Sequence, residues 1–200
     1  MFGPKVIEEF ESKYSGTIRV MQIIGDKYVS TGYWTQSGGI IKDVWKPAFK
    51  KIHAPQNKSW LILGLATGTI AKMIPQPAQI IGVEIDPVMI EIGKKYFDLA
   101  KIPNLKIVIG DARKCIHSSD IILVDLYLVD QLPEFVYSRK FLSNLRNSSA
   151  LAVFNHLYHS EDQKKNAQIL VNKLEKIFSK VELLRSLTNL LVICRSKSDT

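Results

Sequence analysis

An apolar run that ends in a turn of small residues is the feature that most constrains the fold of this chain. The run Trp60–Leu63 leads into the turn Gly64–Gly68 (GLATG), and a second apolar run ends at Glu84. Glycines let the backbone turn tightly, and we expect a helix to begin near Gly68 and to direct its free N–H groups at a ligand. Glu84 follows Gly64 by 20 residues, the spacing of a ribose-binding carboxylate after such a turn. The sequence therefore predicts a site for a nucleoside-containing cofactor.

Strand-like and helical segments alternate from Ser59 onward. The chain then ends in two adjacent β-prone runs, Val181–Leu184 and Leu190–Cys194. This order predicts an α/β fold with a Rossmann-like seven-stranded sheet and a terminal antiparallel hairpin over residues 59–200, an S-adenosylmethionine-binding domain. A nicotinamide-binding domain usually ends in another parallel crossover, so the hairpin favours a sulfonium cofactor. The other expected elements are strands over Trp60–Leu63, Gln79–Val83, Lys106–Ile109, Ile121–Val124 and Leu151–Phe154, and helices before Pro75, after Asp86, over Ser138–Leu145 and after Ser160.

Residues 1–58 have a different pattern and are predicted to form an N-terminal extension with a small β-hairpin and a helix. The alternating runs Thr17–Met21 and Lys27–Thr31 are separated by Gly25-Asp26, which is typical of a hairpin. Residues 32–39 are expected to be a loop, and Lys42–Ile52 a helix with apolar residues on one face. The extension is expected either to cover the pocket or to form a homodimer surface, and the sequence leaves both open.

Composition and charge narrow the classes of function. The net charge is +8, but the lysines are scattered and no DNA-reading helix or arginine-rich arm accompanies them, so we expect no nucleic-acid partner. No apolar run is long enough to span a membrane and the N-terminus lacks a signal-peptide pattern, so we expect a cytoplasmic protein without a membrane partner. Cys115 and Cys194 have no metal-ligand spacing, and the pair His156 and His159 lacks a third ligand, so no metal site is expected.

Five segments occur in the order known from one family, and they are Thr31–Gln36, Leu63–Thr69, Val83–Pro87 (VEIDP), Ile109–Ala112 (IGDA) and Val124-Asp125. Together they resemble the spermidine synthase family, the polyamine aminopropyltransferases within the class I S-adenosylmethionine-dependent methyltransferase superfamily. The segments are similar to its Asp-Gly-x-x-Gln segment, its glycine-rich cofactor loop, its Val-Glu-Ile-Asp-Pro and Gly-Asp-Ala motifs, and the start of its catalytic Asp-Ser-x-Asp-Pro motif. Ala66 stands where a glycine is usual in the loop.

The resemblance implies a role for individual residues. Glu84 would bind the ribose, Asp111 would accept a hydrogen bond from the adenine amino group, and Gln36 would help to hold the tail of the cofactor. The implied cofactor is S-adenosylmethionine or its decarboxylated form, and the predicted cofactor-binding residues are Gln36, Gly64, Leu65, Ala66, Gly68, Glu84, Ile85, Asp111 and Ala112. Asp125 is the predicted catalytic base or amine-orienting group, with Tyr127 and Asp130 as acceptor contacts.

The chain departs from the family pattern on the acceptor side. Leu128 replaces the second aspartate of the catalytic motif, and Ser37–Ile40 stands where the family has Tyr-x-Glu. Because those family residues hold the diamine and deprotonate its nitrogen, we favour methyl transfer over aminopropyl transfer. Between Lys114 and Arg139 all charged residues are acidic, which is consistent with a small-molecule acceptor, with an amine as one candidate.

Three alternatives stay open. The chain could be an aminopropyltransferase that uses decarboxylated S-adenosylmethionine and a polyamine acceptor. The departures at Ala66 and Leu128 instead suit a non-catalytic cofactor-binding or interaction protein. An NAD-binding domain is the third reading, and it predicts affinity for a nicotinamide dinucleotide.

Overall fold

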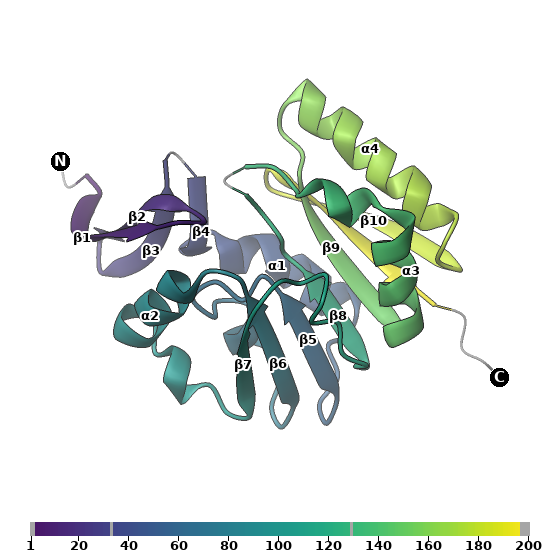
Figure 1. Cartoon of the computed structure of the whole chain (residues 1–200), viewed down its shortest axis with the longest axis horizontal. Coiled ribbons are helices and arrows are strands. Elements are labelled where there is room, and N and C mark those ends of the chain that lie inside the picture. Colours follow the sequence, from purple (N-terminus) through teal and green to yellow (C-terminus); the bar gives the residue numbers. More distant parts are fainter. Residues whose placement is uncertain (1–2, 33, 129, 197–200) are drawn as a thin grey trace.

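The computed structural model describes residues 3–32, 34–128 and 130–196, which form two β-sheets flanked by helices (Figure 1). The larger sheet has seven strands in the order β10-β11-β9-β8-β5-β6-β7, and the smaller has four in the order β1-β2-β3-β4. The α/β fold class predicted from the sequence, with a mostly parallel seven-stranded sheet, is confirmed.

The seven-stranded sheet is parallel in its middle and antiparallel at one edge. Strand β5 (Ser59–Leu63) pairs in parallel with both β6 (Gln79–Glu84) and β8 (Ile121–Val124). The parallel part continues through β7 (Leu105–Ile109) and β9 (Leu151–Leu157), and the terminal hairpin consists of β10 (Lys180–Ser186) and β11 (Asn189–Arg195). Because the chain leaves β5 first to one side and later to the other, a crevice forms at the carboxyl ends of β5 and β8.

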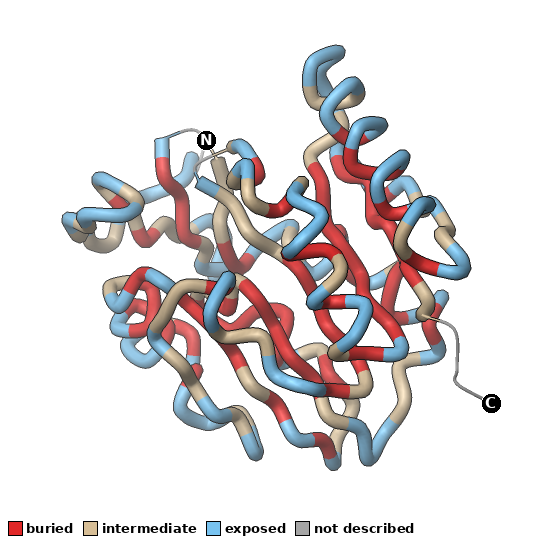
Figure 2. The backbone as a smooth tube through the Cα atoms, turned by 45° about the vertical axis from the view of Figure 1, so that its right-hand side comes forward, coloured by how far each residue is buried: buried red, intermediate tan, exposed pale blue. Residues whose placement is uncertain are grey.

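Helices cover both faces of this sheet. Helix α1 (Ile41–Lys51) packs on the face that carries Trp60 and Ile62 of β5. Helices α3 (Arg139–Ser148) and α4 (Glu161–Glu175) pack on the face that carries Leu61 and Leu63. Figure 2 shows the inner strands of this sheet buried along most of their length. Helix α2 (Pro87–Tyr96) lies beside the smaller sheet, and short 3-10 turns occur at Ala71–Met73, Leu99–Lys101 and Glu134–Tyr137.

Two helix starts follow directly from their sequences. Asp86 Oδ1 accepts a hydrogen bond of 3.0 Å from the N–H of Val88, and Pro87 occupies the first helical position of α2. Ser160 and Gln163 form a reciprocal capping box at the start of α4. Both predicted caps are confirmed.

The prediction of a helix after the glycine turn is wrong. Only the three-residue 3-10 turn Ala71–Met73 forms there. Pro75 and Pro77 follow at once and β6 begins at Gln79, so too little chain remains for an α-helix. The backbone of the turn itself therefore borders the crevice, and no α-helix begins at this turn, all of which the structure describes.

The N-terminal sheet is larger than the predicted hairpin. It contains β1 (Lys5–Ser12), β2 (Gly16–Ile23), β3 (Asp26–Thr31) and β4 (Trp34–Gly38), so most of the expected loop is a strand. Strand β1 is an edge strand whose register shifts between Val6 and Glu8, which interrupts the alternation that identifies a strand from sequence. The division of the chain at residues 58 and 59 stays a prediction.

Buried hydroxyl groups join the N-terminal sheet to the glycine turn and the residue after it. Ser37 Oγ on β4 lies 2.8 Å from Thr69 Oγ1 and accepts a hydrogen bond of 2.7 Å from Thr67 Oγ1. On the neighbouring side, the hydroxyls of Ser12 and Ser15 donate to Asp86 Oδ2 at 2.6 and 2.7 Å. The smaller sheet is thus fixed over the carboxyl ends of β5 and β6.

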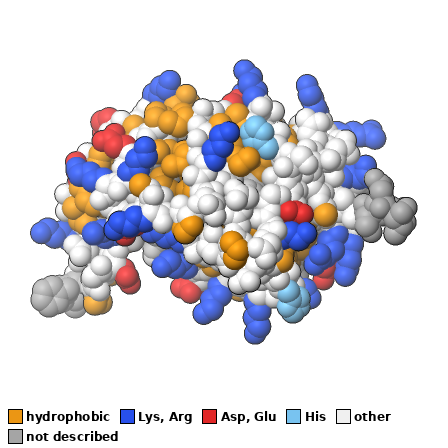
Figure 3. Space-filling model, turned by 90° about the horizontal axis from the view of Figure 1, so that it is seen from below, with side chains coloured by type: hydrophobic (Ala, Val, Ile, Leu, Met, Phe, Trp, Pro, Cys, Tyr) orange, Lys and Arg blue, Asp and Glu red, His pale blue; other side chains and the backbone are white. Residues whose placement is uncertain are grey.

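Two surface properties bear on the sequence expectations. No helix in the described ranges has both the length and the apolar character needed to cross a bilayer. Figure 3 shows the Lys and Arg side chains of one face spread around it with other side chains between them.

Candidate functional site

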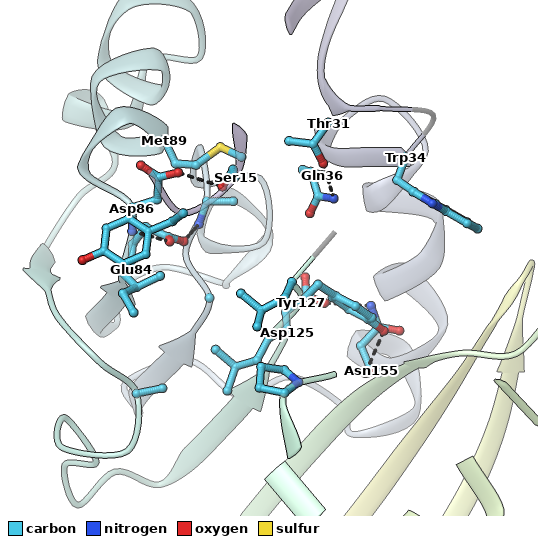
Figure 4. Close-up of a pocket in the computed structure, with 18 of the residues that line it drawn as sticks. Ser15, Thr31, Trp34, Gln36, Glu84, Asp86, Met89, Asp125, Tyr127 and Asn155 are labelled. Atoms are coloured by element: carbon cyan, nitrogen blue, oxygen red, sulfur yellow. Dashed lines mark hydrogen bonds between the residues drawn. The ribbon is translucent and has the colours of Figure 1, made fainter. Parts of the chain in front are cut away.

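A cavity of about 560 Å³ opens between the N-terminal sheet and the carboxyl ends of the parallel strands. This volume is within the range of small-molecule sites. Figure 4 shows Glu84 and Asp86 on one side of it and Asp125 with Asn155 on another. The predicted site residues that line it are Gln36, Gly64, Ala66, Glu84, Ile85, Asp111, Ala112, Asp125 and Tyr127.

Three predicted residues are not among those that line the cavity. Leu65 is buried in the core, where it packs against Gly82, and Gly68 packs against Leu99. Asp130 lies in the loop between the lining residues Leu128 and Pro133 but does not line the cavity itself. The ligand-binding roles of these three residues stay predictions. Tyr33, inside the segment that resembles the family motif at 31–36, lies outside the described residues.

The glycine turn brings the backbone of β5 against the loop that carries Asp125. Gly64 has a φ of +89°, and a Cβ atom at this position would lie 2.1 Å from the carbonyl oxygen of Asp125. Ala66 also has a positive φ, +46°, which costs a residue with a side chain about 1–2 kcal/mol. The alanine at the family's glycine position therefore keeps the left-handed backbone that a glycine would adopt.

Glu84 is held in place by the backbone of two neighbouring segments. Its Oε2 accepts a hydrogen bond of 2.8 Å from the N–H of Ala66, and its Oε1 accepts one of 2.9 Å from the N–H of Asp86. Burial raises the pKa of Glu84, and these two backbone donors partly offset that shift. Each carboxylate oxygen has a second lone pair, so the group can still accept hydrogen bonds from a bound molecule.

Asp111 forms an ion pair at the rim of the cavity. Its Oδ2 lies 2.9 Å from Nε of Arg113, and its Oδ1 accepts from the backbone N–H of Arg113 at 2.8 Å. The Arg113 guanidinium holds the pKa of Asp111 below its usual value. Arg113 was not among the predicted site residues, although its position two residues after Asp111 is typical of a local side-chain turn.

Asp125 follows β8 directly and receives two hydrogen bonds from distant parts of the chain. Asn155 Nδ2 on β9 donates to Oδ1 at 2.8 Å, and Trp45 Nε1 on α1 donates to Oδ2 at 3.3 Å. Burial raises the pKa of Asp125 to about 6, against the effect of these two donors. Both partners are neutral, so the carboxylate is oriented without being neutralised.

Sequence reasoning missed Trp45 and Asn155. Asn155 was placed just after a strand expected to end at Phe154, whereas β9 continues to Leu157. A polar side chain inside an apolar strand beside Asp125 was the available signal. Trp45 sits on the apolar face of α1 and gives no sign of its hydrogen bond in the sequence.

Tyr127 and Gln36 line the cavity with fixed polar groups. The Tyr127 hydroxyl donates to the carbonyl oxygen of Asn155 at 2.9 Å, and burial raises the pKa of this phenol well above its usual value, so the phenol stays protonated. Gln36 Nε2 donates to Thr31 Oγ1 at 2.9 Å. Asp120, which the sequence groups with the acidic stretch, lies at the opposite end of β8, where it accepts from Ser59.

The raised pKa of Asp125 predicts a pH-dependent cost in stability. Its pKa is near 3.8 in the unfolded chain and about 6 in the folded one, so the folded state binds more protons between these values. The contribution of Asp125 to stability therefore falls as the pH rises from about 4 to 7, by about 2–3 kcal/mol. Urea titrations give the free energy of unfolding of Asp125→Asn and of the unchanged chain at each pH. The variant's value minus that of the unchanged chain should rise by this amount over the same interval. A constant difference would contradict the prediction.

The described ranges contain no group of three or more His, Cys, Asp or Glu side chains placed to hold a metal ion. Nε2 of His156 lies 2.9 Å from the hydroxyl of Tyr137, and the ring of His159 packs edge-on against Trp34 with centroids 5.2 Å apart.

The sequence is similar to those of known polyamine aminopropyltransferases. No family model matches the sequence. A polyamine aminopropyltransferase of Vibrio vulnificus is 33% identical over 115 residues, and a probable polyamine aminopropyl transferase of Bifidobacterium longum is 29% identical over 135 residues. The chain is related to the polyamine aminopropyltransferases. The matches cover 50% and 62% of this chain but only 38% and 30% of those two proteins.

Solved structures extend the likeness to the fold of nearly the whole chain. A probable spermidine synthase of Corynebacterium glutamicum matches with a TM-score of 0.77 and 19% identity, over 98% of this chain and 82% of its own. Spermidine synthase of Thermotoga maritima gives a TM-score of 0.73 at 18% identity, over 98% and 74%. Human methyltransferase-like protein 13 in complex with SAH gives 0.59 at 21% identity, over 72% and 74%. The chain shares its fold with spermidine synthases over nearly its whole length and with a methyltransferase-like protein over 72% of it.

Proposed function

We propose that this chain is a transferase that uses S-adenosylmethionine and methylates a small-molecule acceptor, with an amine as the nucleophile. The observation that carries the proposal is that Glu84 and Asp125 face one cavity, on either side of the glycine turn. The first group suits a ribose and the second suits a reacting nitrogen. The relatedness to aminopropyltransferases supports the same class of donor.

The cavity offers a matching partner for each part of the donor. Glu84 would accept hydrogen bonds from the ribose hydroxyls, and Asp111 would accept one from the adenine amino group. Gln36 and the backbone at Gly64 and Ala66 would lie along the rest of the molecule. Ile85 and Ala112 would supply apolar contacts to the adenine ring.

Asp125 is the proposed base. When bound, S-adenosylmethionine supplies a methyl carbon on a positively charged sulfur. The lone pair of the acceptor nitrogen forms the new N–C bond, the electron pair of the broken C–S bond stays on sulfur, and the nitrogen proton passes to the carboxylate of Asp125. Asn155 and Trp45 fix the orientation of that carboxylate and leave its remaining lone pairs for the proton.

Product analysis tests this assignment. The chain is incubated with a panel of amines and either S-adenosylmethionine or its decarboxylated form, and the products are identified by mass spectrometry. A gain of one methyl group on an amine supports the proposal. Binding of S-adenosylhomocysteine without any transfer would favour a non-catalytic cofactor-binding protein, and calorimetric binding of NAD instead would favour a nicotinamide-binding domain.

Aminopropyl transfer is the second candidate, and the charge of the cavity favours it. Four carboxylates line the cavity, on Glu84, Asp86, Asp111 and Asp125. Arg113 is the single Lys or Arg among the described lining residues, and it is paired with Asp111. Such a lining suits the cationic tail of decarboxylated S-adenosylmethionine better than a tail carboxylate. An aminopropylated product in the same assay would establish this alternative.

Removing the carboxylate of Glu84 should weaken binding of the adenosyl group. A charge-assisted hydrogen bond contributes about 1.5–3 kcal/mol, so Glu84→Ala is expected to weaken binding of S-adenosylhomocysteine by roughly ten- to a hundredfold in calorimetry. Glu91→Ala is the matched control, because Glu91 is an exposed acid on α2 outside the cavity. Equal affinities of the two variants would remove Glu84 from the proposed site.

A further inference from the structure

Three apolar residues share the cavity lining with Asp125. Leu128 lies three residues after Asp125, Leu157 lies two residues after Asn155, and Val44 precedes Trp45 on α1. Each of them lines the cavity and belongs to the same helix, strand or loop as a residue of the Asp125 hydrogen-bond group. The carboxylate of Asp125, whose two hydrogen-bond donors are neutral, therefore shares the cavity with apolar side chains.

Part of this apolar surface is uncovered. Leu128 is 53% exposed and Ile40 is 50% exposed, although both line the cavity. A ligand that covers two large exposed apolar side chains at the mouth of a cavity removes their surface from water, which lowers the free energy of the complex. The acceptor end of the cavity is thus suited to an apolar body.

The charges limit how many cationic groups this end can hold. Asp125 accepts hydrogen bonds from two neutral groups, and the one lining Lys or Arg in the described ranges, Arg113, is paired with Asp111. One ammonium can be paired at Asp125. Leu128, Leu157 and Val44 offer no side-chain acceptor to a second ammonium, and an unpaired charge against such side chains is unfavourable.

We propose that the acceptor is a primary amine with a single amino group on an apolar body, with the nitrogen at Asp125 and the body against Leu128 and Leu157, and that a linear diamine is a poor acceptor. This inference rests on the proposed transferase function and names the substrate class of that site. The group-transfer step is the one described above, with the amine nitrogen as nucleophile and Asp125 as proton acceptor.

Equilibrium binding tests the proposal without turnover. The full chain is first saturated with S-adenosylhomocysteine, and the affinities for 2-phenylethylamine and for 1,4-diaminobutane are then measured by calorimetry. Burial of a phenyl ring is expected to give 2-phenylethylamine about a tenfold or greater advantage. Leu128→Asp should reverse this preference, because it adds a second carboxylate at the position where the diamine needs one.

Leu183→Asp is the matched control. Leu183 has the same exposed fraction, 53%, but lies on the edge strand β10 away from the cavity, so this variant should keep the preference of the unchanged chain. Equal or tighter binding of the diamine to the unchanged chain would overturn the inference, as would failure of both amines to bind or an unaltered preference in Leu128→Asp. Failure to bind S-adenosylhomocysteine in the first step would overturn the proposed function itself, so the two failures are distinguishable.

Discussion

Asp125→Asn is expected to lower the turnover of the proposed transferase by about 10²- to 10⁴-fold, the usual contribution of a positioned base. The amide keeps the size of the side chain but cannot take the proton of the acceptor nitrogen. The affinity for S-adenosylhomocysteine should stay within about twofold, because the adenosyl contacts are proposed to lie at Glu84 and Asp111. Turnover and calorimetric affinity, measured on the same sample, separate the two effects.

Asp120→Asn is the matched control for this substitution. Asp120 precedes the same strand, β8, but accepts hydrogen bonds from Ser59 at the end remote from the cavity. Its replacement should leave turnover unchanged below the melting temperature. If Asp125→Asn retains full activity, Asp125 is not the base.

The pH dependence of activity gives a second check on Asp125. The activity of the unchanged chain should fall as the pH drops below about 6, where Asp125 becomes protonated.

Gly64→Ala is expected to be the most destabilising single substitution in the turn. The added Cβ would lie 2.1 Å from the carbonyl oxygen of Asp125, and the φ of +89° is one that alanine rarely adopts. Backbone strain of about 1–3 kcal/mol and overpacking of about 1–3 kcal/mol together predict a loss of about 2–6 kcal/mol in the free energy of unfolding. Because the clash falls on Asp125 itself, activity should be lost along with stability.

Gly25→Ala isolates the contribution of the clash. Gly25 has the same φ, +89°, but no atom lies within 4 Å of the point that an added Cβ would occupy. This variant carries the backbone strain alone and should lose about 1–3 kcal/mol. Urea titrations of the two variants give the difference, and equal losses would show that the backbone of Asp125 moves away from the turn at no cost.

Local signals in the sequence predict much of this molecule. The cap at Asp86, the capping box at Ser160 and the apolar face of α1 each depend on residues a few positions apart, and each is present. The succession of strands along the chain and the terminal hairpin also follow from local patterns of apolar and polar residues. Glu84 and Asp125 could be placed at one cavity because the carboxyl ends of parallel strands lie at the same edge of the sheet, and β6 and β8 both pair with β5.

What the sequence did not predict depends on contacts between distant segments. Trp45 and Asp125 are separated by 80 residues, and no local pattern says that an indole N–H on α1 reaches a carboxylate after β8. The hydroxyl groups of Ser37 and Thr69 meet only because β4 is a strand, and its Gly- and Ser-containing sequence favours a loop. Strand β1 was missed because its Glu-rich sequence lacks regular alternation, and its pairing with β2 supplies the stability that its own sequence lacks.

The hydrogen bond between the indole of Trp45 and Asp125 gives the molecule an internal reporter. The chemical shift of that indole proton depends on whether the carboxylate is charged, so a nitrogen–proton correlation spectrum recorded across a pH series should show one tryptophan signal moving near pH 6. The other two indoles, on Trp34 and Trp60, serve as references within the same spectrum. An amine placed against the carboxylate would move the same signal, so unlabelled ligands could be screened before any reaction is known.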